Sequence, residues 1–293
     1  MKFKGVGVAL VTPFDENGKI DEVALGGLVD DVIAGGVDYL VALGTTSEAA
    51  TMSEAERMEV LRLILEKNNK RVPVMVGIGG NNTAEVVKKL QEFPYADVCD
   101  AVLSVVPYYN KPSQEGMYQH FKAIGACSPL PVFLYNVPGR TVANLAASTV
   151  VRLSNDCPNI IGIKEASGNF AQISEILKFK RHDFIVVSGD DGITLPLMAI
   201  GVEGVISVIA NACSREFSAM VHLAQVGKFG EAAEIHLQLS ELFQALFAEG
   251  NPAGIKAALH LKGIIRNNSL RLPLIPVTPA LYDRLRKLLG VDY

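Results

Sequence analysis

One lysine holds the position in this sequence that best suits covalent chemistry. Lys164 directly follows the apolar, β-branched run 160–163, and no other lysine follows directly on such a run. An ammonium held at the end of a buried strand is partly desolvated, which favours the neutral amine. A neutral amine attacks carbonyl carbons and forms Schiff bases, so Lys164 is a candidate nucleophile. The alternative is a structural lysine paired with Glu165 or with an aspartate of residues 188–192.

Other polar side chains follow further apolar runs. Tyr135 ends the run 132–135, and its phenol can relay protons to an imine or aldol oxygen, or simply cap the core. Arg140 lies in a Pro-Gly loop, where its planar guanidinium either binds a carboxylate substrate or is only solvated. Thr45 and Thr46 lie on a turn that begins with glycine, and they offer hydroxyls and N–H groups to a carboxylate or to ordinary capping. Aldol-type and pyridoxal enzymes both use such a lysine, so these residues alone leave the reaction open.

Eight apolar runs would position these residues. They are continuous rather than alternating, as in parallel strands buried on both faces. The runs are 5–11, 39–43, 74–78, 101–106, 132–135, 160–163, 184–187 and 204–208. Amphipathic stretches predict helices between them at 22–34, 53–67, 83–93, 114–126, 144–154 and 170–179. Runs that begin about 20 to 36 residues apart have the length of a βα unit, so the sequence predicts an α/β fold, a (β/α)₈ TIM barrel.

The strand signal stops after residue 208. Residues 215–289 indicate helices only, with breaks near Gly250-Asn251-Pro252 and in the proline-rich segment 272–279. This tail is longer than a last barrel helix requires. We therefore expect a catalytic barrel at 1–225 and a C-terminal helical domain at 226–293.

Composition excludes several classes of protein. Of the 293 residues, 49% are hydrophobic and 20% are charged, which is enough for a large core. The net charge of −4 gives no electrostatic reason to expect a nucleic-acid partner. The longest uncharged stretch, 123–139, contains three prolines, so no membrane span is expected. Without a secretory segment or paired cysteine motifs, the chain is predicted to be a cytoplasmic protein.

Cofactor motifs are missing or incomplete. Asn82 stands where the last glycine of GxGxxG would be, so dinucleotide binding is poorly supported. The five histidines show no metal-ligand spacing, so no metal site is expected.

Five motifs in order point to one known family. They are Gly44-Thr45-Thr46-x-Glu48, Pro107-Tyr108-Tyr109-Asn110-Lys111-Pro112, Tyr135-Asn136-Val137-Pro138-Gly139-Arg140-Thr141, Ile161-Gly162-Ile163-Lys164-Glu165-Ala166-Ser167-Gly168 and Ser188-Gly189-Asp190-Asp191. The chain resembles the dihydrodipicolinate synthase family of the N-acetylneuraminate lyase superfamily, from residue 11 to the C-terminal helices. The resemblance implies a TIM barrel with a C-terminal helical domain. It also implies a lyase that condenses pyruvate with L-aspartate 4-semialdehyde, the first committed step of lysine and diaminopimelate biosynthesis, without a metal or organic cofactor.

The resemblance assigns roles in proton transfer. Lys164 would form the Schiff base with pyruvate, and Tyr135 would donate and accept protons in a relay with Thr46 and Tyr109. In the family the second tyrosine enters the neighbouring subunit's site. The resemblance therefore also implies a homo-oligomer, a dimer of dimers.

It assigns roles in substrate binding as well. Thr45 and Thr46 would hold the pyruvate carboxylate, and the backbone at Ile206 would line the pocket. Arg140 would bind the carboxylate of aspartate semialdehyde, and it favours the synthase over the sugar lyases of the superfamily. Ser47 replaces the glycine usual at this point, a departure that concerns the kinetics more than the reaction.

Some members of the family bind L-lysine as a feedback effector. The matching positions are Ala49, Asn81, Glu85 and Tyr108. Arg57 stands where sensitive enzymes often carry histidine or glutamate, and a cation there disfavours cationic lysine. We expect weak or absent inhibition.

Three other functions compete with the synthase. A related pyruvate aldolase would accept a sugar aldehyde, and a non-catalytic barrel would bind a keto acid without forming an adduct. A pyridoxal enzyme would absorb near 400 nm as purified.

Overall fold

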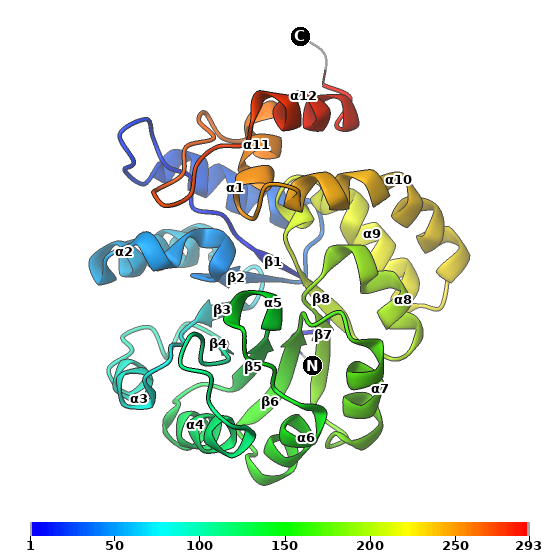
Figure 1. Cartoon of the computed structure of the whole chain (residues 1–293). Helices are drawn as coiled ribbons and strands as arrows, with labels where there is room; N and C mark the ends of the chain where they lie inside the picture. The colour runs from blue at the N-terminus through cyan, green and yellow to red at the C-terminus, as the bar shows by residue number, and fades with distance from the viewer. Residues whose placement is uncertain (1, 292–293) are drawn as a thin grey trace. The chain divides into compact units, whose positions relative to one another are not determined.

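The computed structural model describes residues 2–291 and contains a closed barrel of eight parallel strands (Figure 1). The strands follow one another around the barrel in chain order, from β1 to β8. Their bounds are β1 Gly5–Ala9, β2 Tyr39–Ala42, β3 Val74–Gly77, β4 Ala101–Val105, β5 Val132–Asn136, β6 Ile160–Glu165, β7 Ile185–Ser188 and β8 Gly204–Ser207. The predicted (β/α)₈ fold is confirmed, and each strand lies within two residues of its predicted bounds.

Helices occupy the predicted segments between strands. They are α1 Glu22–Ala34, α2 Glu54–Asn68, α3 Thr83–Gln91, α4 Gln114–Cys127, α6 Ala147–Asp156 and α7 Phe170–Phe179. After β8 come α9 Ser214–Gln225, α10 Phe229–Phe247, α11 Ala253–Leu261 and α12 Pro279–Leu288. Two further helices, α5 Pro138–Thr141 and α8 Thr194–Ala199, are not predicted from the sequence, because four to six residues are too few to show a helical period.

Local capping explains where two of these helices begin. The Asp21 side chain accepts a hydrogen bond from the Ala24 N–H and begins α1. Ser53 and Glu56 form a reciprocal capping box at the start of α2. Both interactions join residues three positions apart, so they are encoded locally.

The described chain comprises two compact units. The first unit contains the residues up to Lys4 together with Pro73–Ile206, and the second contains Gly5–Val72 together with the residues from Ser207 onward. The predicted domain boundary after residue 225 stays a prediction.

The first unit carries the strands from β3 onward. Residues of β4, β5, β6 and β7 are almost entirely buried, and α3, α4, α6 and α7 flank the strands in Figure 1. The strand pairs are parallel, with Val105 beside Tyr135 and Tyr135 beside Lys164. This register sets which side chains stand together at the carboxyl ends of the strands.

The second unit combines β1 and β2 with helices from both ends of the chain. Helix α9 packs on β1 and on α10, and α11 packs on α10 and α12. Between residues 2 and 291, every helix is too short or too polar to cross a lipid bilayer.

Candidate active site

Lys164 and Tyr135 lie side by side at the ends of β6 and β5. They are paired in register, so their side chains leave the sheet on the same face. Both are buried, at 6% and 8% exposure, and Lys164 Nζ lies 4.5 Å from the centroid of the Tyr135 ring. The phenol and the amine therefore share one environment at the strand ends, as the sequence predicted.

The Tyr135 ring is the neighbour of the Lys164 amine, which has no polar or charged partner among the described residues of its own unit. Among the described residues of the first unit, Lys164 forms no ion pair and no hydrogen bond. Glu165, one of the partners considered for a structural lysine, directs its carboxylate elsewhere. The interpretation of Lys164 as the ion-pair partner of Glu165 is therefore wrong for this unit, and the amine is available to a carbonyl compound.

Glu165 is held by uncharged donors. Asn136 Nδ2 donates to both carboxylate oxygens at 3.2 and 3.0 Å, and Gln172 Nε2 donates to Oε2 at 3.0 Å. The Ser167 N–H donates to Oε1 at 2.7 Å. We call Asn136, Glu165, Ser167 and Gln172 the amide cluster. With Glu165 only 1% exposed, these donors replace the water that a buried carboxylate loses.

The amide cluster also holds the segment that follows Arg140. Asn136 Oδ1 accepts a hydrogen bond from the Leu145 N–H at 3.0 Å, and Asn136 Nδ2 donates to Asn144 Oδ1 at 2.9 Å. Arg140 lies exposed on α5, directly after β5, and forms no ion pair within the described part of the first unit. Asn136 thus joins the end of β5, which carries Tyr135, to the segment that follows Arg140.

Gly189 leaves the space that the Lys164 side chain occupies. A Cβ atom at this position would lie 2.6 Å from Ala166 Cβ and 2.9 Å from Lys164 Cε. Gly189 directly follows β7, whose Val187 is in register with Lys164. Only a residue without a side chain fits there, so the glycine is part of the lysine's site.

The loop that carries Tyr108 and Tyr109 is fixed by asparagines. Asn81 Nδ2 donates to the Tyr108 carbonyl at 3.1 Å, and Asn110 Nδ2 donates to the Asn81 carbonyl at 3.0 Å. Tyr109 has a φ of 73° and is 88% exposed. An ordered backbone that presents a large aromatic side chain to the outside is a feature of contact surfaces. Tyr109 is thus not packed into the first unit.

The remaining predicted residues of the first unit differ in exposure. Ile206 lies on β8 and is 1% exposed. Glu85 lies in the first turn of α3 and is exposed. Asn81 and Tyr108, two of the predicted effector residues, are joined by the hydrogen bond described above.

In the second unit, Thr45 and Thr46 lie on a single 3₁₀ turn, η1 (Thr45–Ser47), directly after β2. Thr45 is exposed and Thr46 is buried. The Thr46 hydroxyl accepts a hydrogen bond from Asn251 Nδ2 at 2.9 Å. The hydroxyl keeps its own proton for another acceptor. The sequence does not reveal this contact of Thr46, because Asn251 lies in a Gly-Asn-Pro break far along the chain.

A buried ion pair stands next to this turn. Lys256 Nζ bonds Glu48 Oε1 at 2.5 Å, and both side chains are fully buried. Desolvation lowers the pKa of Lys256 to about 8, although the neighbouring Glu48 carboxylate acts in the opposite direction. The sequence contains one signal for this pair: Lys256 is a charged residue inside the apolar segment 253–261, where a buried charge needs a partner.

The predicted effector residue of this unit, Ala49, lies close by in sequence, as does Arg57, which is expected to disfavour lysine. Ala49 begins the next 3₁₀ turn, η2 (Ala49–Thr51), and Arg57 pairs with Glu54 on α2. No described cluster of histidine, cysteine, aspartate or glutamate between residues 2 and 291 could hold a metal ion.

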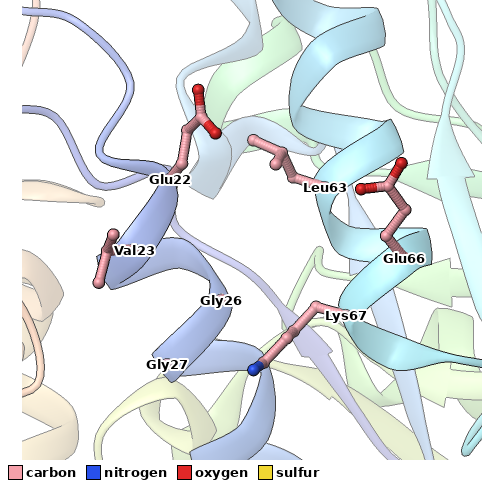
Figure 2. A pocket seen from close by; sticks show the side chains of 7 residues that line it. All are labelled: Glu22, Val23, Gly26, Gly27, Leu63, Glu66 and Lys67. Carbon is pink, nitrogen blue, oxygen red and sulfur yellow. The ribbon is translucent and has the colours of Figure 1, made fainter.

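A groove of about 400 Å³ opens elsewhere in the second unit, between α1 and α2 (Figure 2). Figure 2 shows Gly26 and Gly27 of α1 facing side chains of α2. Its lining residues are Glu22, Val23, Gly26, Gly27, Leu63, Glu66 and Lys67. None of them is a predicted site residue, so the groove is separate from the strand-end chemistry.

The fold and the strand-end pair define a class of protein. It is a (β/α)₈ barrel enzyme with a buried lysine beside a tyrosine, and this lysine has no ion pair among the described residues of its unit, an arrangement suited to Schiff-base chemistry. The model of the dihydrodipicolinate synthetase family matches residues 2–291. The chain belongs to this family.

Individual relatives agree with the family match. The 4-hydroxy-tetrahydrodipicolinate synthase of Parabacteroides distasonis is 51% identical over 289 residues, which cover 99% of this chain and 97% of the relative. The dihydrodipicolinate synthase structure from Thermotoga maritima matches with a TM-score of 0.95 at 40% identity, covering 99% and 98% of the two chains. The chloride-inhibited enzyme from Acinetobacter baumannii, complexed with pyruvate, matches with a TM-score of 0.94 at 39% identity and 99% coverage of both chains.

These relatives confirm the sequence-based prediction of activity. The prediction was a lyase with the activity of a 4-hydroxy-tetrahydrodipicolinate synthase, acting in lysine and diaminopimelate biosynthesis.

Proposed function

We propose that the chain condenses pyruvate with L-aspartate 4-semialdehyde through a Schiff base on Lys164. The observation that carries this proposal is the register pair of Lys164 and Tyr135, in which the amine has no ion-pair partner in its unit. The relatives' activity and the pyruvate bound to the Acinetobacter enzyme support the choice of substrates.

The reaction begins at the amine of Lys164. The amine attacks the carbonyl carbon of pyruvate, water leaves, and the resulting iminium draws electrons from the neighbouring methyl carbon. Loss of a methyl proton gives an enamine, which attacks the aldehyde carbon of the second substrate. The amino group of that substrate then attacks the imine carbon, which closes the ring and releases Lys164.

Proton movements fall to the phenol beside the amine. Tyr135 accepts and returns protons as water leaves and as the aldol oxygen forms. By the family motifs, Thr46 and Tyr109 extend this relay. The Lys164 amine lies over the Tyr135 ring, and this position supports the role of Tyr135.

Carboxylate groups on both substrates require their own binding residues. Thr45 and Thr46 hold the pyruvate carboxylate, and the backbone at Ile206 lines the pocket. Arg140 binds the carboxylate of the semialdehyde, and its exposure without an ion pair in the first unit supports this assignment. The guanidinium gives two parallel hydrogen bonds to one carboxylate.

The exposed tyrosine supports an assembly of several copies of the chain. We assign the chain to a homo-oligomer, a dimer of dimers, in which Tyr109 completes the site of a second copy; its exposure of 88% supports this role. The enzyme acts in the cytoplasm, and residues 226–293 form its C-terminal helical domain. Ala49, Asn81, Glu85 and Tyr108 form an effector site that binds L-lysine weakly or not at all, because Arg57 adds a cation.

One pair of measurements tests the function. We expect pyruvate consumption with aspartate semialdehyde and none with N-acetylmannosamine, which separates the synthase from a sugar lyase. Borohydride reduction with pyruvate should add mass at Lys164, and Lys164→Met should abolish the adduct, whereas the exposed control Lys178→Met should keep it. A wild-type chain without an adduct would identify a non-catalytic barrel, and an adduct that persists in Lys164→Met would move the nucleophile elsewhere.

A further inference from the structure

The turn that carries Thr45 and Thr46 ends in an unfavourable backbone conformation. Glu48 has a φ of 59° and a ψ of 31°, in the left-handed region that residues with a side chain rarely adopt. Its N–H donates to the Thr45 carbonyl at 3.1 Å, and its carbonyl accepts from the Thr51 N–H at 3.0 Å. The conformation of the turn is therefore fixed at Glu48, and something must compensate for its cost.

The side chain of Glu48 supplies this compensation. One carboxylate oxygen bonds Lys256 Nζ at 2.5 Å, and the other accepts the Arg271 N–H at 2.9 Å. Lys256 Nζ also donates to the Ser269 carbonyl at 2.9 Å and lies 4.2 Å from the centroid of the Phe14 ring. These contacts hold both charged groups in place, and Lys256 is 0% exposed.

An ion pair of this kind is an inefficient way to stabilise a fold. Desolvation of two buried charges offsets much of their attraction, and apolar side chains of similar volume often serve stability equally well. A buried pair does, however, select one arrangement, because any other leaves a charge without a partner. The pair thus acts on the geometry of the turn more than on the total stability.

We propose that Glu48 and Lys256 are positioning residues of the reaction: they hold η1 so that Thr45 and Thr46 meet the pyruvate carboxylate. The inference rests on the proposed function, which places both threonines on that carboxylate. Lys256 belongs to α11, 208 residues after Glu48. By this inference the C-terminal helices take part in pyruvate recognition.

The test separates positioning from stability with three variants. Glu48→Gln and Lys256→Met each leave one buried partner alone, whereas the double variant Glu48→Gln/Lys256→Met removes both charges and should fold with near wild-type thermal stability. The readouts are the pyruvate concentration for half-maximal borohydride trapping at Lys164, the KM of each substrate and the unfolding temperature. The exposed pair of Arg62 and Glu66 provides the control variant Glu66→Gln.

We expect the double variant to require about 10-fold to 100-fold more pyruvate for half-maximal trapping, because small displacements of a binding group have effects of this size. The KM of the semialdehyde should stay close to the wild-type value, and Glu66→Gln should change neither quantity. A purely structural pair would lower the active fraction without changing the half-saturating pyruvate concentration.

Two results would overturn the inference alone. One is a folded double variant with wild-type pyruvate dependence, and the other is an equal rise in the KM of both substrates. A wild-type chain that forms no pyruvate adduct would instead overturn the proposed function, and the inference with it.

Discussion

Two buried glutamates, Glu48 in the second unit and Glu165 in the first, adjoin residues that we place in the reaction, yet their carboxylates are held in different ways. Glu48 is paired with the ammonium of Lys256. Glu165 receives only uncharged N–H donors, from Asn136, Ser167 and Gln172. Both residues are at most 2% exposed, so burial alone does not explain the difference.

The difference follows the charge that each site must bind. Lys164, the residue before Glu165, becomes a cationic iminium in the proposed reaction, and a second buried cation beside it would disfavour that state. Amide donors hold Glu165 without adding positive charge. In the proposed reaction the turn after β2 receives an anionic carboxylate, and a buried cation in that unit does not disfavour the binding of an anion. The partners of the two buried glutamates thus agree with the charge that the proposed reaction brings to each site.

The largest effect is expected from breaking the charged pair. Glu48→Gln should lower the free energy of unfolding by about 3–5 kcal/mol, because it leaves the Lys256 ammonium buried without a partner. Glu48→Gln/Lys256→Met should recover most of this loss, as measured by urea denaturation. Equal losses in the single and double variants would show that the charge on Lys256 is not the cause.

The next effect concerns the space around Lys164. Gly189→Ala places a Cβ atom 2.9 Å from Lys164 Cε, so the lysine must move away from its position beside Tyr135. We expect kcat/KM for pyruvate to fall by about 100-fold, with a slower rate of borohydride trapping. The control is Gly230→Ala, where a Cβ atom would meet no neighbour within 4 Å. Unchanged trapping in Gly189→Ala would mean that Lys164 tolerates displacement.

A smaller effect is expected at the amide cluster. Glu165→Gln replaces one acceptor oxygen by a donor facing Asn136 or Gln172, at a cost of about 1–3 kcal/mol in the free energy of unfolding. Because Asn136 also holds the segment after Arg140, the KM of the semialdehyde should rise more than that of pyruvate. This is the opposite of the pattern expected for Glu48 and Lys256.

A matched control for this variant lies on the surface. Glu175→Gln, on the exposed side of α7, removes the same charge without entering the amide cluster. If Glu165→Gln raises the KM of pyruvate more than that of the semialdehyde, the idea that Glu48 affects pyruvate binding and Glu165 affects semialdehyde binding is wrong.

The smallest effect is a pH dependence of the second unit. The hydrogen bonds from Arg271 lower the pKa of Glu56 from 4.5 to about 2. A lowered carboxyl pKa contributes stability that is complete above pH 4.5 and is lost as the pH falls from 4.5 towards 2. Solvent screening reduces the contribution to ~1 kcal/mol, because the Glu56 side chain is 34% exposed. Glu56→Gln should flatten the acid limb of the stability profile, and an unchanged limb would contradict this account.

The sequence by itself determined the barrel and the residues at its strand ends. The apolar runs, the caps at Asp21 and Ser53 and the position of Lys164 at the end of β6 depend on neighbours a few residues away, so they can be predicted from the sequence alone. The structure kept all eight strands and gave Tyr135 and Lys164 a common register. The strands and the residues at their ends were therefore predicted from local patterns in the sequence.

Only the tertiary structure decided what surrounds those residues. Lys256 and Glu48 are 208 residues apart in the chain, and no local pattern links a lysine of α11 to the turn after β2. Likewise, the space that Gly189 leaves for Lys164 exists only because β6 and β7 lie side by side. Side-chain identities set which residues can carry the chemistry, but packing between distant segments sets their partners, because charge compensation and excluded volume act through space rather than along the sequence.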